Sequence, residues 1–264
     1  MRLILTFIPL LLLLSCGSDE IDTNEEPIIE TAVEMSKSDS LIQDAIIAHG
    51  GDLYNQAHYK FTFRDKLYTF KNDSENYTYT SEYQTDQGWQ IDELINGDFN
   101  RSLDDKKVIL SEQEAGNYGE SLNSVVYFAT LPHKLSDASV SSEHKGQTII
   151  NLQKYEVVKV TFNQDGGGED FEDEYVYWIN SKTKTMDYFA YNYQVNGGGV
   201  RFRVAYNPRT VDGVLFQDYA NHSAEVDTPL EDLPALFELD SLPEISIIEL
   251  VGVKSLKWKV TKLL

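Results

Sequence analysis

Hydrophobic and polar residues alternate at a period of two along most of the chain. The alternation is clearest where aromatic or branched side chains share one face: Tyr59, Phe61 and Phe63; Tyr77 and Tyr79; Val158, Val160 and Phe162; Tyr175, Tyr177 and Ile179; Phe189, Tyr191 and Tyr193. This period is typical of half-buried β-strands. Polar turn signals separate the segments at 72–73, 86–88, 96–98, 165–168, 196–199 and 212–213. Successive strands with short turns predict an antiparallel meander that forms one long curved sheet, a half-barrel.

Three segments depart from this alternation. Residues 38–49 predict a helix with Ser38 or Asp39 as N-cap, an apolar stripe from Leu41 to Ala48, and Gly50-Gly51 at its end. Residues 121–135 predict a short helix or buried loop on the concave face. Residues 228–239 predict a short helix with Thr228 as N-cap, limited by Pro234.

The last apolar segment, residues 245–258, predicts one further strand. Strands and helices do not alternate regularly, which disfavours an α/β barrel or a doubly wound sheet. The fold class that we expect is α+β, mainly β: a long curved antiparallel sheet with one N-terminal helix and short inserted helices.

The N-terminus has the layout of a secretory signal peptide. Arg2 precedes an almost wholly apolar stretch, residues 3–14, which is too short for a bilayer core of about 30 Å. Residues Leu13-Leu14-Ser15-Cys16 resemble the lipobox of bacterial lipoproteins, whose cysteine is acylated. We therefore expect a lipoprotein signal peptide at 1–15 and lipidation at Cys16, the one cysteine of the chain. The alternative is an ordinary signal peptide that contains a cysteine.

Residues 16–37 are polar and acidic, and we interpret them as a lipidated spacer that precedes a half-barrel domain at 38–264. Ser18-Asp19-Glu20 resembles the acidic signals that send some Bacteroidota lipoproteins to the cell surface; simple spacer chemistry is the alternative. The expected location is the cell envelope, as an outer membrane lipoprotein on the periplasmic side or at the cell surface.

The composition excludes several classes of partner. The formal charge of −21 and the absence of a basic patch exclude nucleic acid. With Cys16 acylated, no thiol remains for a disulfide or a thiolate nucleophile. We expect a monomer that contacts the membrane through its lipid.

Several short runs resemble a family of flavobacterial (Bacteroidota) lipoproteins that carries a domain of unknown function. The runs are Ala48-His49-Gly50-Gly51, Tyr127-Phe128-Ala129 with Leu131-Pro132, Tyr175–Asn180, Met186–Tyr193 and residues 197–203. The expected architecture also resembles the half-barrels of envelope lipoprotein carriers, which enclose an apolar cavity. Some members of the lipoprotein family carry an aldolase name, but such aldolases need an α/β barrel with a Schiff-base lysine.

Arg201 and Arg203 are two residues apart in a predicted strand, so both face one side, while Val200, Phe202 and Val204 face the other. On the concave side the two arginines could clamp an anionic head group. The alternative is an ion ladder with Glu172 and Glu174. Tyr175, Tyr177, Tyr191 and Tyr193 are the further candidate ligand contacts, although tyrosine is also a common core residue of sheets.

Metal and catalytic chemistry have little support in the sequence. The five histidines show no zinc-site spacing. We interpret His49 as a favourable charge at a helix C-terminus, with a metal shared between His49 and His58 as the alternative. The acids at 169–174 are expected to form a solvated hairpin tip rather than a calcium site. Because catalytic motifs are absent, we expect no catalytic residue, no metal, no cofactor and no enzymatic activity.

These features predict a membrane-anchored lipoprotein that binds an apolar or amphiphilic ligand inside the half-barrel. The alternative is a cell-surface module that binds glycan or protein without a cavity. An apolar cavity of several hundred Å³ would favour the first function.

Overall fold

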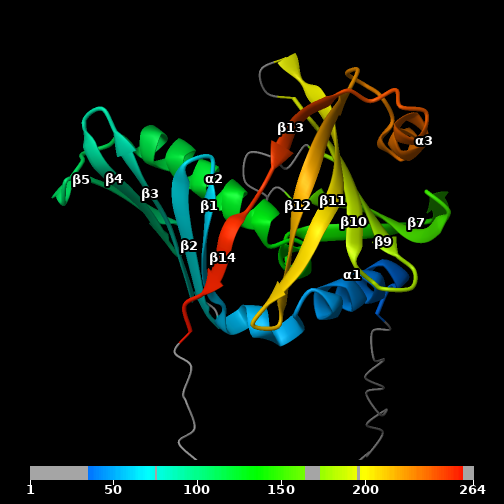
Figure 1. Ribbon diagram of the computed structural model, residues 1–264, viewed down its shortest axis with the longest axis horizontal. Helices are drawn as coiled ribbons and strands as arrows, with labels where there is room; N and C mark the ends of the chain where they lie inside the picture. Colours follow the sequence, from blue (N-terminus) through cyan, green and yellow to red (C-terminus); the bar gives the residue numbers. More distant parts are fainter. Residues whose placement is uncertain (1–34, 75, 164–172, 195–196, 258–264) are drawn as a thin grey trace, which may run out of the picture. The chain divides into compact units, whose positions relative to one another are not determined.

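The computed structural model describes residues 35–74, 76–163, 173–194 and 197–257 (Figure 1). The signal peptide, Cys16, nearly all of the acidic spacer, and Glu169, Asp170 and Glu172 lie outside the described residues. Within the described ranges, no helix is both long and apolar enough to cross a membrane.

The first half of the described chain forms a helix and a seven-stranded antiparallel sheet. Helix α1 (Lys37–Ala48) leads into the 3₁₀ turn η1 (Gly51–Gln56). The strands that follow are β1 (His58–Phe63), β2 (Lys66–Asp73), β3 (Asn76–Thr85), β4 (Gly88–Ile95), β5 (Asp98–Leu103) and β6 (Lys106–Lys107). The order in this sheet is β14-β1-β2-β3-β4-β5-β6, so the last strand, β14 (Val251–Ser255), returns to the edge formed by β1.

The second half forms another seven-stranded antiparallel sheet, in the order β13-β12-β11-β10-β9-β8-β7. Its strands are β7 (Val140–Ile150), β8 (Gln153–Phe162), β9 (Tyr175–Asn180), β10 (Met186–Tyr193), β11 (Gly199–Val211), β12 (Val214–Ala224) and β13 (Glu244–Ile248). The predicted class, α+β and mainly β, is confirmed. The expected single sheet is instead divided in two, and along the chain helix α2 (Glu112–Ala129) and the turn η2 (His133–Ser136) come between β6 and β7.

Helix α1 begins two to three residues earlier than predicted. Its N-cap is Ser36, whose side chain accepts a hydrogen bond from the N–H of Asp39 at 3.0 Å. Ser38, an expected cap, is buried and donates to the carbonyl of Ser142 at 3.2 Å. At the other end Gly50 has φ of 126°, a value that glycine adopts at little cost.

Helix α2 is much longer than the short helix expected at 121–135. It starts with a capping box in which Ser111 and Glu114 each accept from the backbone of the other. The first half of this helix is polar and contains Gly116 and Gly119. The sequence therefore has no apolar stripe there from which a helix could be predicted. Gly119 lies against the side chains of Phe99 and Leu94. A Cβ atom added at Gly119 would be only 3.4 to 3.5 Å from them.

The C-terminal elements also differ from expectation. The short helix expected at 228–239 forms as η5 (Leu230–Asp232) and α3 (Leu233–Glu238). Thr228 does not cap it and instead donates to the carbonyl of Glu225 at 2.7 Å. The single strand expected at 245–258 is two strands, β13 and β14 (Val251–Ser255), which pair with β12 and β1 in different sheets.

Among the residues that the structure describes, three apolar clusters form the core. In one, α1 packs on the second sheet through residues such as Leu41, Ile42 and Ala45. In another, α2 packs on the first sheet through Leu122 and Val126. The third lies on the opposite face of the second sheet, beneath α3. The second sheet is thus covered on both faces, which explains why every residue of β9 is buried.

Candidate ligand-binding cavity

A cavity of about 250 Å³ lies where α2, the second sheet and the connection between β13 and β14 meet. Its walls mix aromatic and aliphatic groups with a few polar side chains. The lining residues are Phe63, Arg64, Ser124, Val125, Phe128, Ala129, Tyr191, Arg203, Gln217, Tyr219, Asn221, Ile248 and Leu250.

Strand register brings the polar residues of the cavity to one face. Gln217, Tyr219 and Asn221 alternate along β12, so their side chains share a face. Arg203 on β11 lies directly opposite Asn221. Phe128 of α2 packs over this face, with its ring stacked on that of Tyr191 at 5.7 Å between centroids.

Arg203 is the buried charge of the cavity, with only 8% of its surface exposed. Its Nη2 donates to the hydroxyl of Tyr191 at 2.9 Å, and its guanidinium lies 4.4 Å from the ring centroid of Phe128 and 5.3 Å from that of Phe189. No carboxylate among the described residues forms an ion pair with it. Aromatic rings attract a cation, but they offset the loss of its hydration only in part.

Three polar atoms of this cavity have no hydrogen-bond partner among the described residues: Arg203 Nε, Gln217 Oε1 and Asn221 Oδ1. Gln217 and Asn221 are 6% and 8% exposed. Seven buried side-chain atoms in the described part of the chain lack a partner, and nearly half of them therefore gather at this one cavity. Buried polar groups are normally paired, so such a concentration indicates a binding site.

The charge of the cavity is opposite to that of the protein. Although the chain carries a formal charge of −21, the lining includes Arg203 and, in an exposed position, Arg64, and it includes no Asp or Glu. A larger hollow of about 740 Å³ between α2 and strands β4 and β5 is the reverse: it is lined by Asp98, Glu112 and Glu120 and by no Lys, Arg or His. Of these two, the smaller cavity is the one that suits an anion.

The residues singled out from the sequence are divided among three environments. Arg203 and Tyr191 line the cavity together. Arg201 donates instead to the hydroxyl of Tyr193 and to the carbonyl of Val200, and Tyr193 lines a separate polar hollow of about 290 Å³. Tyr175 and Tyr177 are buried in the core beneath α1.

The alternative role for the two arginines, an ion ladder, is wrong for the part that the structure describes. Glu174 pairs with Lys159 at 2.6 Å rather than with Arg201 or Arg203. Glu172 lies outside the described residues. The arginines instead contact tyrosine hydroxyls.

Sequence reasoning missed Arg64, Gln217, Tyr219 and Asn221. On β12 the polar residues Gln217 and Asn221 alternate with Asp218 and His222, which are buried too, so no amphipathic pattern marks the face that α2 covers. Arg64 lies in a tight turn between β1 and β2, where its φ is 49°. A charged turn residue is ordinarily interpreted as solvent-exposed.

His49 is not the helix-terminal charge expected from the sequence. It is only 1% exposed, and burial together with the nearby His133 lowers its pKa to about 3, so the ring is neutral. Its Nε2 accepts the N–H of Met186 at 3.2 Å, and its carbonyl accepts from His133 Nε2 at 3.3 Å. Burial also lowers the pKa of His133 to about 4. The described residues contain no group of three or more His, Cys, Asp or Glu that could hold a metal.

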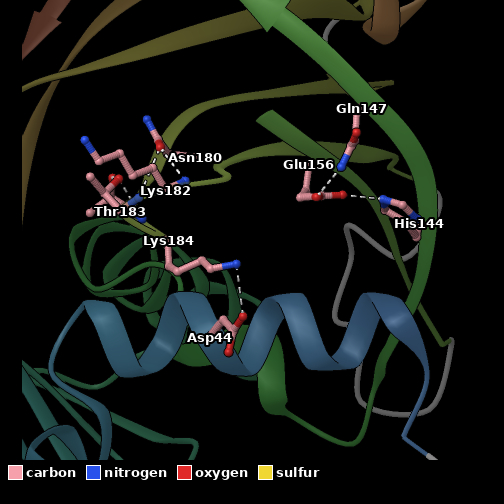
Figure 2. A network of polar contacts seen from close by, with 9 residues as sticks. Asp44, His144, Gln147, Glu156, Asn180, Lys182, Thr183 and Lys184 are labelled. Atoms are coloured by element: carbon pink, nitrogen blue, oxygen red, sulfur yellow. Dashed lines mark hydrogen bonds and ion pairs between the residues drawn. The ribbon is translucent and has the colours of Figure 1, made fainter. Parts of the chain in front are cut away.

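A second group of polar residues, near α1, serves the fold rather than a site (Figure 2). Asn180 Oδ1 accepts the N–H groups of Lys182 and Thr183 at 3.0 and 3.1 Å and shapes the turn between β9 and β10. Lys184 joins that turn to Asp44 of α1 at 3.3 Å. On β8, the two carboxylate oxygens of Glu156 contact His144 at 2.8 Å and Gln147 at 2.6 Å. These contacts join the residues of this group to one another.

Comparisons with known proteins give one family and several weak structural likenesses. A family of unknown function (DUF6503) matches residues 2–250. The comparison with curated proteins gives no match. A solved LolA superfamily protein from Nitrosomonas europaea is 10% identical with a TM-score of 0.48, covering 85% of this chain and 96% of its own. A DUF1329 family protein from Desulfovibrio piger is 9% identical with a TM-score of 0.44, covering 84% and 94%.

A third solved structure, lipoprotein LppX from Mycobacterium tuberculosis, is 10% identical with a TM-score of 0.28, covering 61% of this chain and 89% of its own. Neither the matching family nor any of these three proteins is described as an enzyme. Likenesses at this level do not show a function.

Proposed function

The chain belongs to DUF6503, a family of unknown function, and from that premise we propose that it binds an anionic amphiphile in the cavity between α2 and strands β10 to β12. The expected membership of a family with a domain of unknown function is confirmed by the match over residues 2–250. The description of the family names no ligand.

Arg203 is the observation that carries this proposal. A guanidinium that is 8% exposed and has no carboxylate partner among the described residues is costly to bury. Its Nε is unpaired, and the residue lines the cavity. A ligand carboxylate or phosphate would supply the missing charge and accept that hydrogen bond, and charge-assisted bonds of this kind are about twice as strong as neutral ones.

The remaining walls suit an apolar tail. Phe63, Val125, Phe128, Ile248 and Leu250 supply aromatic and aliphatic surface. Burial of apolar area contributes roughly 25 cal/mol per Å². The volume of about 250 Å³ is just below the usual range of roughly 300 to 1,000 Å³ for ligand pockets, so a chain of medium length fits better than a complete phospholipid.

We place this activity at a membrane of the cell envelope, in a monomer attached through lipidated Cys16. Support comes from the sequence Leu13-Leu14-Ser15-Cys16 after a short apolar segment. The acidic residues that follow fit an outer membrane lipoprotein of Bacteroidota. Because several acyl chains on one cysteine anchor a protein permanently, a tethered protein would receive or present its ligand and not shuttle it.

The cavity favours this function over the alternative of a surface module that binds glycan or protein without a cavity. A module of that kind needs no buried cation beneath its helix. Mass spectrometry of molecules that remain bound after gentle extraction from native membranes would identify the ligand directly. Recovery of the protein with no bound amphiphile would count against the proposal.

We expect Arg203→Ala to weaken the binding of decanoate by about 10- to 100-fold, because a hydrogen bond to a charged group contributes about 1.5–3 kcal/mol. Titration calorimetry on the full chain carrying Cys16→Ser, purified without detergent, measures this. Arg201→Ala is the matched control: its guanidinium already bonds to Tyr193 and Val200, so we expect less than a twofold change. Equal losses in both variants, or no decanoate binding by the parent protein, would contradict the proposal.

A further inference from the structure

The two unpaired amide oxygens at the cavity indicate that a ligand needs more than a negative charge. Oδ1 of Asn221 and Oε1 of Gln217 are hydrogen-bond acceptors, and neither has a donor among the described residues. A fully ionised acidic group offers them only further acceptors. A carboxylate or a fully ionised phosphate at Arg203 would therefore leave both oxygens unpaired, at the cost that a buried acceptor without a donor carries.

The orientation of the Asn221 amide follows from its neighbours. Its Nδ2 donates to the hydroxyl of Ser246 on β13 at 3.1 Å. Asn221 also lies directly opposite Arg203 in the β11–β12 ladder. Because Nδ2 is engaged in this way with Ser246, Oδ1 is the amide atom that remains without a partner.

Asn221 and Gln217 engage different atoms of a ligand. They are four residues apart on one strand, so about 13 Å separates their Cα atoms at roughly 3.3 Å per residue. The ring of Tyr219 lies between them on the same face, and all three residues line the cavity. Asn221 thus faces the region of the ligand next to its acid, and Gln217 faces a region farther along the chain.

We infer that the ligand is an acid whose polar end also donates hydrogen bonds, through a hydroxyl or an amide N–H close to the acidic group. This rests on the proposed function and names the ligand class for the same cavity. Hydroxylated fatty acids and N-acyl amino acids both have this chemistry, whereas a simple fatty acid has not. A site with a buried acceptor selects strongly for a ligand that carries the matching donor.

The test compares three probes of similar length on the full chain carrying Cys16→Ser: decanoate, 3-hydroxydecanoate and N-octanoylglycine. Decanoate has the acid alone, while the other two add a hydroxyl or an amide N–H near the acid. We expect at least one donor-bearing probe to bind five- to tenfold more tightly than decanoate in titration calorimetry. The better of the two distinguishes a hydroxylated from an amide-linked ligand.

Two variants assign the preference to Asn221. Asn221→Ala should reduce the advantage of the donor-bearing probe over decanoate, measured on the same variant, to less than twofold. Ser246→Ala is the matched control, because it removes the same Asn221–Ser246 bond but keeps the amide oxygen, and it should keep the preference. Gln217→Ala is a second test at the other acceptor, and we expect a weaker loss of the preference.

The outcomes separate this inference from the proposed function. If all three probes bind equally to the parent protein, or the preference survives Asn221→Ala, the ligand class is wrong while anionic binding stands. If none of the probes binds, the proposed function itself fails. A preference that Ser246→Ala also abolishes would overturn the assignment to the amide oxygen.

Discussion

Replacing Asp218 by alanine is expected to lower the free energy of unfolding by about 3–5 kcal/mol, the usual cost of removing one partner of a buried ion pair. Asp218 is 3% exposed and accepts hydrogen bonds from Arg209, Asn207 and the N–H of Leu250, at 2.7 to 2.9 Å. Without it, Arg209 would remain partly buried without a counter-charge. Urea unfolding followed by circular dichroism measures the change.

The same substitution should also disturb the cavity. Arg209 donates to the carbonyl of Leu250 as well as to Asp218, so the two residues together hold the connection between β13 and β14. Leu250 lines the cavity, and we expect decanoate binding to weaken. Asp86→Ala, in an exposed turn, is the matched control and should change stability by about 0.5 kcal/mol or less. A loss of less than 1 kcal/mol in Asp218→Ala would disprove this role.

Acidification should destabilise the protein through its two buried histidines. His49 and His133 have folded-state pKa values of about 3 and about 4, below the ordinary value of 6.5. Between these values the unfolded chain binds more protons than the folded one, so stability is complete above pH 6.5 and falls as the pH decreases. From pH 7.5 to 4.5 we expect each histidine to contribute a loss of about 2–3 kcal/mol.

Urea unfolding at the two pH values tests this expectation. His133→Phe keeps the stacking on Tyr54, which lies 4.2 Å away between ring centroids, but cannot titrate. The variant should be less stable at pH 7.5, since it loses the bond to the His49 carbonyl, and should show a smaller dependence on pH. Ring proton signals of His49 and His133 that titrate near pH 6.5 in the folded protein would refute the mechanism.

Local patterns in the sequence predicted the strands well. Period-two alternation placed Tyr175, Tyr177 and Ile179 on one face of β9, and they share the cluster beneath α1. The same reasoning set Arg201 and Arg203 on one face of β11 and Phe202 on the other, where it packs in the cluster beneath α3. Side chains alternate between the two faces of any paired strand, so these faces do not depend on the rest of the fold.

Contacts between distant residues decided the features that were missed. The last apolar segment divides at Leu250 because Asp218, 32 residues away in sequence, takes its N–H out of the ladder. His49 looks like an exposed residue at a helix end, but its carbonyl accepts from the N–H of Leu215 at 3.0 Å and from His133, and it is buried. No local pattern contains such partners.

For the site, the sequence by itself determined the chemistry that is available and the face on which it lies. It supplied Arg203 and Tyr191 on neighbouring strands, and Gln217 and Asn221 at even spacing on the next. Only the tertiary structure decided that α2 lies over Arg203 and shields it, while Arg201, two residues away, pairs with Tyr193 outside the cavity. The physical reason is that burial, unlike strand direction, depends on what packs above a side chain, and that helix comes from a segment with no apolar stripe in its first half.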